Sequence, residues 1–237
     1  MTQTIFEKYG DETTITDQLD WTGNSKTAFS TLGASNHSEY TRAADDFYET
    51  PAEGVTRLLD RPDLAPSTNA VIWECAAGRG AISNVLSDRG YTVYSTELRD
   101  RGFGKTGVDF LTAGRPNTEG RPLVIFTNPP FAKGLEFIKH SLELLHDGES
   151  CYFLLRLSFL EGQKRQAFFE KQNPEVVAVF GKRITCNRNG SEQMSNSGAV
   201  AFAWFKWTKG YIGKTTVEWI ENYVKALFYN WHDGREA

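Results

Sequence analysis

Short apolar runs alternate with helical segments along most of this 237-residue chain. Strands that alternate with helices are typical of βαβ units, which build a mostly parallel sheet with helices on both faces. We expect strands at Val71–Glu74, Tyr91–Glu97, Val108–Phe110, Leu123–Thr127, Cys151–Leu160, Val176–Phe180 and Ala199–Trp207. We expect helices at Pro51–Asp60, Ala81–Gly90, Gly134–Leu145, Glu161–Lys171 and Thr215–Trp231. The sequence therefore predicts an α/β fold.

The two ends of the chain differ from this pattern. Residues 1–45 are polar and have few apolar periodicities, so they are predicted to form an N-terminal arm or cap, and residues 46–237 to form one domain. The last two expected strands have no helix between them, which predicts an antiparallel hairpin at one edge of the sheet. The C-terminal helix would place Val217, Ile220 and Val224 on one side. That side packs on its own sheet or forms a dimer contact, so monomer and homodimer both stay open.

Composition limits the class of protein. The three cysteines are widely spaced, which is typical of free thiols in a reducing compartment. The four histidines are scattered along the sequence, so we expect no metal site. The chain has neither a signal peptide pattern nor an apolar run near the ~20 residues that span a bilayer, so we expect a cytoplasmic protein without membrane contact. A formal net charge of −4 excludes a wholly basic nucleic-acid binder. Local basic excesses remain at Arg99–Lys105 and Lys182–Lys209.

A glycine-rich turn follows the first strand. Glu74 is followed by Cys75-Ala76-Ala77-Gly78-Arg79-Gly80 and then by a helix. Such a turn lets the backbone approach a ligand and directs helix N–H groups into the crevice at the carboxyl end of the strand. Glu97 ends the next strand and can accept hydrogen bonds from both hydroxyls of a ribose. Asp109 and Phe110, at the end of the third strand, suit an adenine ring, although an ordinary strand-end acid and a core Phe explain them as well.

The motif Asn128-Pro129-Pro130-Phe131 is the most informative signal. It ends an apolar strand, and two consecutive prolines cannot continue a central strand, so the turn is stiff. A stiff turn can hold the Asn128 side-chain oxygen and a proline carbonyl as two fixed acceptors. These suit a planar amino group with two hydrogens to donate, and Phe131 would stack on the base that carries it.

This set of motifs resembles the amino-methyltransferases of DNA, and the chain is also similar over nearly its full length to compact methyltransferase-like proteins of phages and prophages. Phe47-Tyr48-Glu49-Thr50-Pro51 matches the clamp of the DNA amino-methyltransferases. The resemblance to the phage and prophage proteins lies in the stretches Gly33–Ser38, Thr127–Phe131, Phe159–Gly162 and Ser197–Ala201. The resemblance implies a Rossmann-like class I methyltransferase, with a seven-stranded, mostly parallel sheet and an antiparallel edge strand. It also implies S-adenosylmethionine as cofactor. The implied cofactor-binding residues are Tyr48, Thr50 and Pro51 of the clamp, Glu74, Ala76, Gly78 and Gly80 of the turn, and Glu97, Asp109, Phe110 and Asn128.

Within the resemblance, Thr50 would bind the carboxylate of the cofactor and Glu74 its amino group. The chain departs from the family in two respects. Cys75 replaces the usual proline after the first acid, and no separate target-recognition domain has room in the sequence. The base-stacking aromatic residue that the family carries after the sixth strand is not identifiable, and the loop Gly181–Gly198 stands in its place.

The implied activity is methylation of the exocyclic amino group of adenine in DNA. We expect catalysis by Asn128, Pro129, Pro130 and Phe131 on a flipped base, a short or relaxed recognition sequence, and a location in the cytoplasm of a bacterial host. The alternatives are the same chemistry on RNA or on a protein glutamine, and a catalytically silent DNA-binding relative. Methylation at a cytosine carbon would need a cysteine after a proline, and none of the three cysteines has that position.

Overall fold

The computed structural model describes residues 48–184, 186–188, 200–220, 229–230 and 235–236. The chain divides into two units, residues 1–39 and 40–237, and every described residue belongs to the second. The predicted polar arm, the Gly33–Ser38 stretch and most of the Gly181–Gly198 loop lie outside the described residues.

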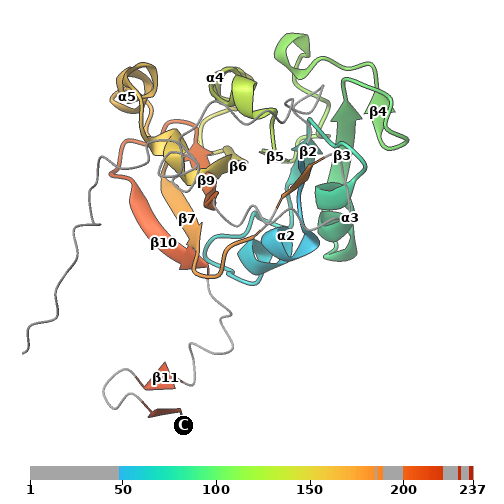
Figure 1. Cartoon of the computed structure of the whole chain (residues 1–237). Coiled ribbons are helices and arrows are strands. Elements are labelled where there is room, and N and C mark those ends of the chain that lie inside the picture. The colour runs from blue at the N-terminus through green and yellow to red at the C-terminus, as the bar shows by residue number, and fades with distance from the viewer. Residues whose placement is uncertain (1–47, 185, 189–199, 221–228, 231–234, 237) are drawn as a thin grey trace, which may run out of the picture. The chain divides into compact units, whose positions relative to one another are not determined.

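An eight-stranded sheet forms the centre of the domain (Figure 1), in the order β10-β7-β9-β6-β5-β2-β3-β4. All neighbours pair in parallel except β9, which is antiparallel to both β6 and β7. The strands are β2 (Val71–Glu74), β3 (Thr92–Glu97), β4 (Lys105–Thr106), β5 (Leu123–Thr127), β6 (Ser150–Arg156), β7 (Val176–Phe180), β9 (Phe202–Thr208) and β10 (Thr216–Ile220). Two further pairs are β1 (Tyr48–Glu49) with β8 (Asn187–Arg188), and β11 (Tyr229–Asn230) with β12 (Arg235–Glu236). The prediction of a mostly parallel sheet is confirmed.

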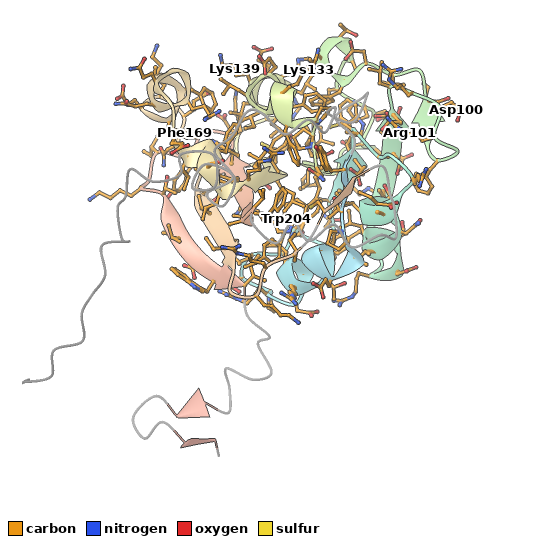
Figure 2. All side chains as sticks on the ribbon, viewed as in Figure 1. Asp100, Arg101, Lys133, Lys139, Phe169 and Trp204 are labelled. Carbon is orange, nitrogen blue, oxygen red and sulfur yellow. The ribbon has the colours of Figure 1, made fainter. Side chains whose placement is uncertain are left out.

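Helices cover both faces of this sheet (Figure 1). One face carries α2 (Ala52–Leu59) and α3 (Ala81–Asp88), and the other carries α4 (Gly134–Leu144) and α5 (Gln163–Phe169). Each face has its own apolar core, because the central strands are buried on both sides. Trp204 of β9 lies in the interior (Figure 2), and its indole N–H donates to the carbonyl of Gly54 in α2 at 2.8 Å. That bond ties the first helix to the last third of the chain.

The sequence predicted an antiparallel hairpin at one edge of the sheet, but the antiparallel strand lies in the interior of the sheet. β9 is inserted between β6 and β7, and β10 forms the edge as a parallel neighbour of β7. β9 suits an interior position because Phe202, Ala203, Trp204, Phe205 and Trp207 are all buried. The sheet has eight strands and not seven, because Lys105–Thr106 and Thr216–Ile220 belong to it while the predicted strand Val108–Phe110 does not.

The predicted C-terminal helix is therefore wrong over its described part. Thr216–Ile220 pairs with Val176–Phe180 along its whole length, which supplies the backbone hydrogen bonds that a helix would have made internally. Residues 221–228 lie outside the described residues, and Tyr229–Asn230 is extended.

Two other element predictions need correction. Val108–Phe110 is not a strand, because the Asp109 carboxylate accepts the N–H of Leu111 at 3.0 Å and caps a short 3-10 helix, Phe110–Thr112. The strand predicted at Cys151–Leu160 ends at Arg156 and continues as a 3-10 turn, Leu157–Leu160. Among the described residues, none of the helices has the length and apolar character that crossing a lipid bilayer requires.

Candidate active site

A cavity of about 290 Å³ opens at the carboxyl ends of β2, β3 and β5. Its walls include most of the predicted site residues, namely Tyr48, Thr50, Glu74, Ala76, Glu97, Asp109, Phe110, Asn128, Pro129 and Pro130. Four predicted residues, Pro51, Gly78, Gly80 and Phe131, do not line it. Because parallel strands end at the same edge, the topology brings motifs that lie up to 82 residues apart in the sequence into one pocket.

The acid Glu74 lies at the floor of the cavity and is only 1% exposed. The hydroxyl of Thr127 donates to its Oε1 at 3.1 Å, and that of Ser83 to its Oε2 at 3.5 Å. Burial raises the pKa of the Glu74 carboxyl well above its ordinary value, and the charge of Glu97 raises it further. A cationic group that entered the cavity would provide the missing counter-charge.

The second acid, Glu97, is held by the turns around it. Its Oε2 accepts the N–H of Gly78 at 2.8 Å, and its Oε1 accepts the N–H of Arg99 at 3.1 Å. The guanidinium of Arg101 lies 3.9 Å from the same Oε1. A carboxylate has about four lone-pair positions, so these two N–H bonds leave acceptor capacity on both oxygens. Glu97 can therefore accept two neighbouring hydroxyl groups from the cavity side.

Gly80 allows the chain to turn from β2 into α3. It has φ +88°, and a Cβ at this position would lie 2.6 Å from the ring of Phe103. Gly78 also has a positive φ, of 56°, and its N–H is the one that holds Glu97. The two predicted glycines thus act through the shape of the loop, without lining the cavity.

Gly80→Ala is expected to destabilise the protein by about 1–3 kcal/mol, because it combines an unfavourable φ with the Phe103 contact. Gly90→Ala is the matched control. Gly90 has φ +83° but nothing within 4 Å of the added Cβ. Chemical denaturation of both variants would measure the difference. Equal destabilisation would show that the Phe103 contact contributes nothing.

The side chain of Asn128 is oriented by the clamp segment. Its Nδ2 donates to the carbonyl of Tyr48 and to the hydroxyl oxygen of Thr50, both at 3.0 Å. These two bonds use both amide hydrogens, so they fix which way the amide points. The opposite atom, Oδ1, is buried and has no hydrogen-bond partner among the described residues. A buried acceptor left without a donor costs free energy, so such an atom is a candidate ligand contact.

The sequence predicted that Phe131 faces the cavity and stacks on the base, but Phe131 does not line the cavity. Its ring stacks on Tyr48, with centroids 4.8 Å apart, and the guanidinium of Arg156 lies over it at 4.5 Å. Phe202 contacts it at 5.8 Å. The aromatic ring that this group presents to the cavity is that of Tyr48, which lines the wall. Phe131 is therefore a packing residue. Its position in the motif gave no indication of this role.

Asp109 and Phe110 have different environments. Asp109 is exposed at the wall of the cavity and caps the 3-10 helix with one oxygen. Phe110 is 2% exposed and packs edge-on against Trp73 and His140, with centroids 5.1 and 5.0 Å away. Only part of this core residue reaches the cavity.

Sequence reasoning missed Arg79, Lys133 and Arg156 as site residues, whereas Arg99 and Arg101 belong to a loop, Arg99–Gly107, that the sequence offered as a candidate for contact with the target. Arg79 and Lys133 line the cavity, as do Arg99 and Arg101 of the predicted basic segment, and Arg156 covers Phe131. In Figure 2, Lys133 at the start of α4 and Arg101 after β3 lie along the upper side of the domain. For Arg79, Arg99 and Lys133, the available signal was a position in the turns that follow predicted strands, whereas Arg156 lay inside the predicted strand Cys151–Leu160.

The arrangement combines two buried acids, a free amide oxygen and an aromatic wall in one crevice. The acids suit a ligand with a cationic group and a pair of hydroxyls, and the amide oxygen suits a donor of hydrogen bonds. Among the described residues, no group of three His, Cys, Asp or Glu side chains is placed to hold a metal ion.

The comparison with known proteins identifies the fold. No family model and no curated protein matches the sequence. Among solved structures, the chain is similar to the methyltransferase subunit of a type I restriction-modification system from Streptococcus thermophilus, with a TM-score of 0.54 and 13% identity. The chain shares that methyltransferase fold. The match covers 82% of this chain and 51% of the subunit, so the chain spans about half the length of that relative.

Weaker likenesses involve other methyltransferases. The M protein of the type I restriction enzyme EcoKI matches with a TM-score of 0.47 and 14% identity over 72% of this chain and 45% of its own. A predicted O-methyltransferase from Agrobacterium tumefaciens matches with a TM-score of 0.47 and 12% identity over 71% and 85%. The fold itself does not define a substrate, which has to be inferred from the site.

Proposed function

We propose that this chain transfers a methyl group from S-adenosylmethionine to the exocyclic amino nitrogen of adenine in DNA. The observation that carries the proposal is the buried, unpartnered Oδ1 of Asn128, which the clamp segment holds in one orientation. An acceptor that is already desolvated and fixed needs no reorganisation when a donor arrives. The methyltransferase fold is consistent with this chemistry.

The chemistry of the amino group explains why acceptors are required. The lone pair of an aromatic amine is delocalised into the ring, so the nitrogen is a poor nucleophile. In the proposal, Asn128 Oδ1 and the carbonyl of Pro129 accept the two N–H groups, which favours the rehybridised nitrogen that attacks. The carbonyl of Pro130 is already used, because it accepts the N–H of Lys133 at 2.9 Å. Pro129 is therefore the proline that we assign as the second acceptor.

The cavity also suits the proposed cofactor. When bound, S-adenosylmethionine supplies an electrophilic methyl group on a sulfonium. Glu74 would hold its amino group, Glu97 its two ribose hydroxyls, and Asp109 with Phe110 its adenine. The hydroxyl of Thr50 accepts from Asn128 and keeps its own hydrogen available for the carboxylate of the cofactor.

We assign the aromatic wall for the target base to Tyr48, because its ring lines the cavity. Phe131 would then support Tyr48 from behind through the 4.8 Å stacking contact, in place of direct contact with the base. Stacking on an aromatic ring is worth ~1–3 kcal/mol per base, so this wall would contribute to holding a flipped adenine.

The cysteines do not favour a covalent mechanism. Burial raises the pKa of the Cys75 thiol well above its ordinary value, which keeps the sulfur beside the cavity protonated. Burial also raises the pKa of the Cys186 thiol to about 12. A direct in-line transfer that depends on positioning is the mechanism that the site supports.

The proposal can be tested by incubating the protein with methyl-labelled cofactor and DNA, followed by digestion to nucleosides and identification by mass. We expect N6-methyl-2′-deoxyadenosine from DNA, and sequencing of the modified positions should give a short or relaxed site. Parallel reactions with RNA and with protein test the alternatives. Label in RNA or glutamine alone would overturn the DNA assignment, and no detectable cofactor binding by calorimetry would favour a silent relative.

Thr50→Val is expected to lower kcat by up to about 10-fold, because it removes one of the two hydrogen bonds that orient the Asn128 amide. It should also raise KM for the cofactor through the loss of the hydroxyl. Thr50→Ser keeps the hydroxyl and should restore both parameters. Steady-state kinetics with varied DNA and varied cofactor separate the two effects. Unchanged kcat in the valine variant would argue against an orienting role.

A further inference from the structure

Exposed cations follow four adjacent strands at the edge that carries the cavity. The sheet order includes β6-β5-β2-β3, and the carboxyl ends of these strands lead to Arg156, Lys133, Arg79 and Arg99, in the same order. All four side chains belong to exposed residues. We call these four residues the basic row.

We propose that the basic row binds the phosphodiester backbone of DNA, which runs across the strand ends above the cavity. The inference rests on the proposed function for the identity of the polymer, and on the structure for the row itself. It assigns a binding surface to a chain whose overall net charge is negative, −4. A local row of this kind is sufficient, because phosphate contacts depend on nearby charge and not on net charge.

Charge at this edge is separated by depth. The two acids that face the proposed cofactor are buried, with Glu74 at 1% and Glu97 at 8% exposure. Arg79, Arg99 and Lys133 line the same cavity but are exposed at its mouth. A cationic ligand is therefore favoured at the floor and an anionic one at the rim. Acids at the floor and cations at the rim are the arrangement that a site needs when it binds a sulfonium cofactor inside the cavity and a polyanion across its mouth.

The exposed acids near the row have local partners. Asp100 accepts the N–H of Gly102 at 3.0 Å, and Asp109 accepts the N–H of Leu111 at 3.0 Å. These bonds hold one oxygen of each carboxylate in its own turn. The acids therefore reduce the positive potential of the row, and the four exposed cations of the row outnumber these two acids.

The dimensions of the row suit a nucleic acid strand. Neighbouring strands lie ~4.8 Å apart, so four adjacent strand ends extend over roughly 15 Å. One DNA strand rises ~3.4 Å per nucleotide, so this length corresponds to about four nucleotides. The row passes beside Asn128, because Lys133 follows it by five residues and Arg156 covers Phe131 of the same turn. Phosphates on either side of a flipped base would therefore lie within reach of the row.

Arg156 is the member that we expect to have the greatest effect. Its guanidinium lies over the Phe131 ring at 4.5 Å, which limits the orientations of its planar group. A guanidinium held by a ring can still offer a pair of N–H groups to one phosphate, which a lysine cannot do. Arg156→Lys should therefore weaken DNA binding even though it keeps the charge.

The test is the salt dependence of binding to a labelled DNA duplex, measured by fluorescence anisotropy with the full chain and saturating cofactor. Each phosphate contact that is lost should reduce the slope of log K against log salt by about 0.9. We expect this reduction for Arg156→Gln and for Lys133→Gln, and about twice this reduction for the double variant. Lys171→Gln with Lys214→Gln is the matched control, because both residues are exposed and precede β7 and β10 at the opposite edge.

The possible results separate this inference from the proposed function. Slopes that stay at the wild-type value in the row variants would overturn the basic row, even if adenine methylation is found. Reduced slopes without any methylation would support the row and remove the proposed activity. A row-dependent slope with RNA and none with DNA would overturn the assignment of the polymer.

Discussion

Asn128→Ala is expected to lower kcat for methyl transfer by about 100-fold or more. The substitution removes the fixed acceptor, and the loss of one preorganised hydrogen-bonding group in a desolvated site costs about that much in other enzymes. The cavity keeps both acids, so cofactor affinity should change little. Single-turnover assays with labelled cofactor would measure the rate, and calorimetry the affinity.

Asn128→Asp is the informative companion variant. It keeps an oxygen but loses both hydrogens that bind Tyr48 and Thr50, so its carboxylate would face the carbonyl oxygen of Tyr48 and could be satisfied at Thr50 only by turning that hydroxyl hydrogen away from the cofactor. We therefore expect low activity in this variant also. If the alanine variant turned over at the wild-type rate, the assignment of Asn128 and with it the proposed mechanism would be wrong.

Glu74→Gln is expected to weaken binding of the cofactor by at least about 100-fold, and at the same time to stabilise the ligand-free protein at neutral pH. The first effect follows because a buried carboxylate opposite a cationic amine is replaced by a neutral amide, and breaking a buried pair costs roughly 3–5 kcal/mol. The second follows because the wild-type carboxyl is buried, and the groups that donate to it within the described residues are two neutral hydroxyls, those of Ser83 and Thr127.

The pH dependence of this stabilisation has a definite sign. Burial raises the pKa of Glu74 in the folded protein above the ordinary value of 4.5. Below pH 4.5 the carboxyl is protonated in both states, so wild type and variant should differ little. As the pH rises, the unfolded chain loses the proton first, and the wild type loses stability at up to about 1.4 kcal/mol per pH unit until the raised pKa is passed. Urea denaturation of both proteins from roughly pH 4 to pH 8 would measure the difference between their free energies of unfolding at each pH. A difference in free energy of unfolding that did not change with pH would show that the pKa of Glu74 is the same in the folded and the unfolded protein.

The sequence was a reliable guide where one signal was decisive. Leu123–Thr127 and Val176–Phe180 are strands with the predicted bounds, because apolar runs of that length are bounded by proline or glycine turns. The alternation of strands with helices then placed Glu74, Glu97 and Asn128 at one edge, since parallel strands share a carboxyl end. The position of the cavity that holds the candidate site was predictable for this reason.

Other features depend on tertiary contacts that sequence patterns do not contain. Val217 and Ile220 have a spacing that fits a helix, but pairing with β7 made this segment a strand. Asp109 capped a 3-10 helix where a strand was predicted. The motif predicted that Phe131 would stack on a base, and only the packing of Tyr48 and Arg156 on its ring shows that it does not face the cavity.

The internal position of β9 also determines when the sheet can be completed during synthesis. β7 has no direct pairing with β6, so within the sheet the strands β7 and β10 are connected to β6 through residues 202–208. Until the ribosome releases that strand, the apolar edges of β6 and β7 both stay open to pairing with other chains. We infer that the nascent protein depends most on chaperones late in translation, and that a stop codon before residue 202 would give an aggregating product in place of a smaller folded domain.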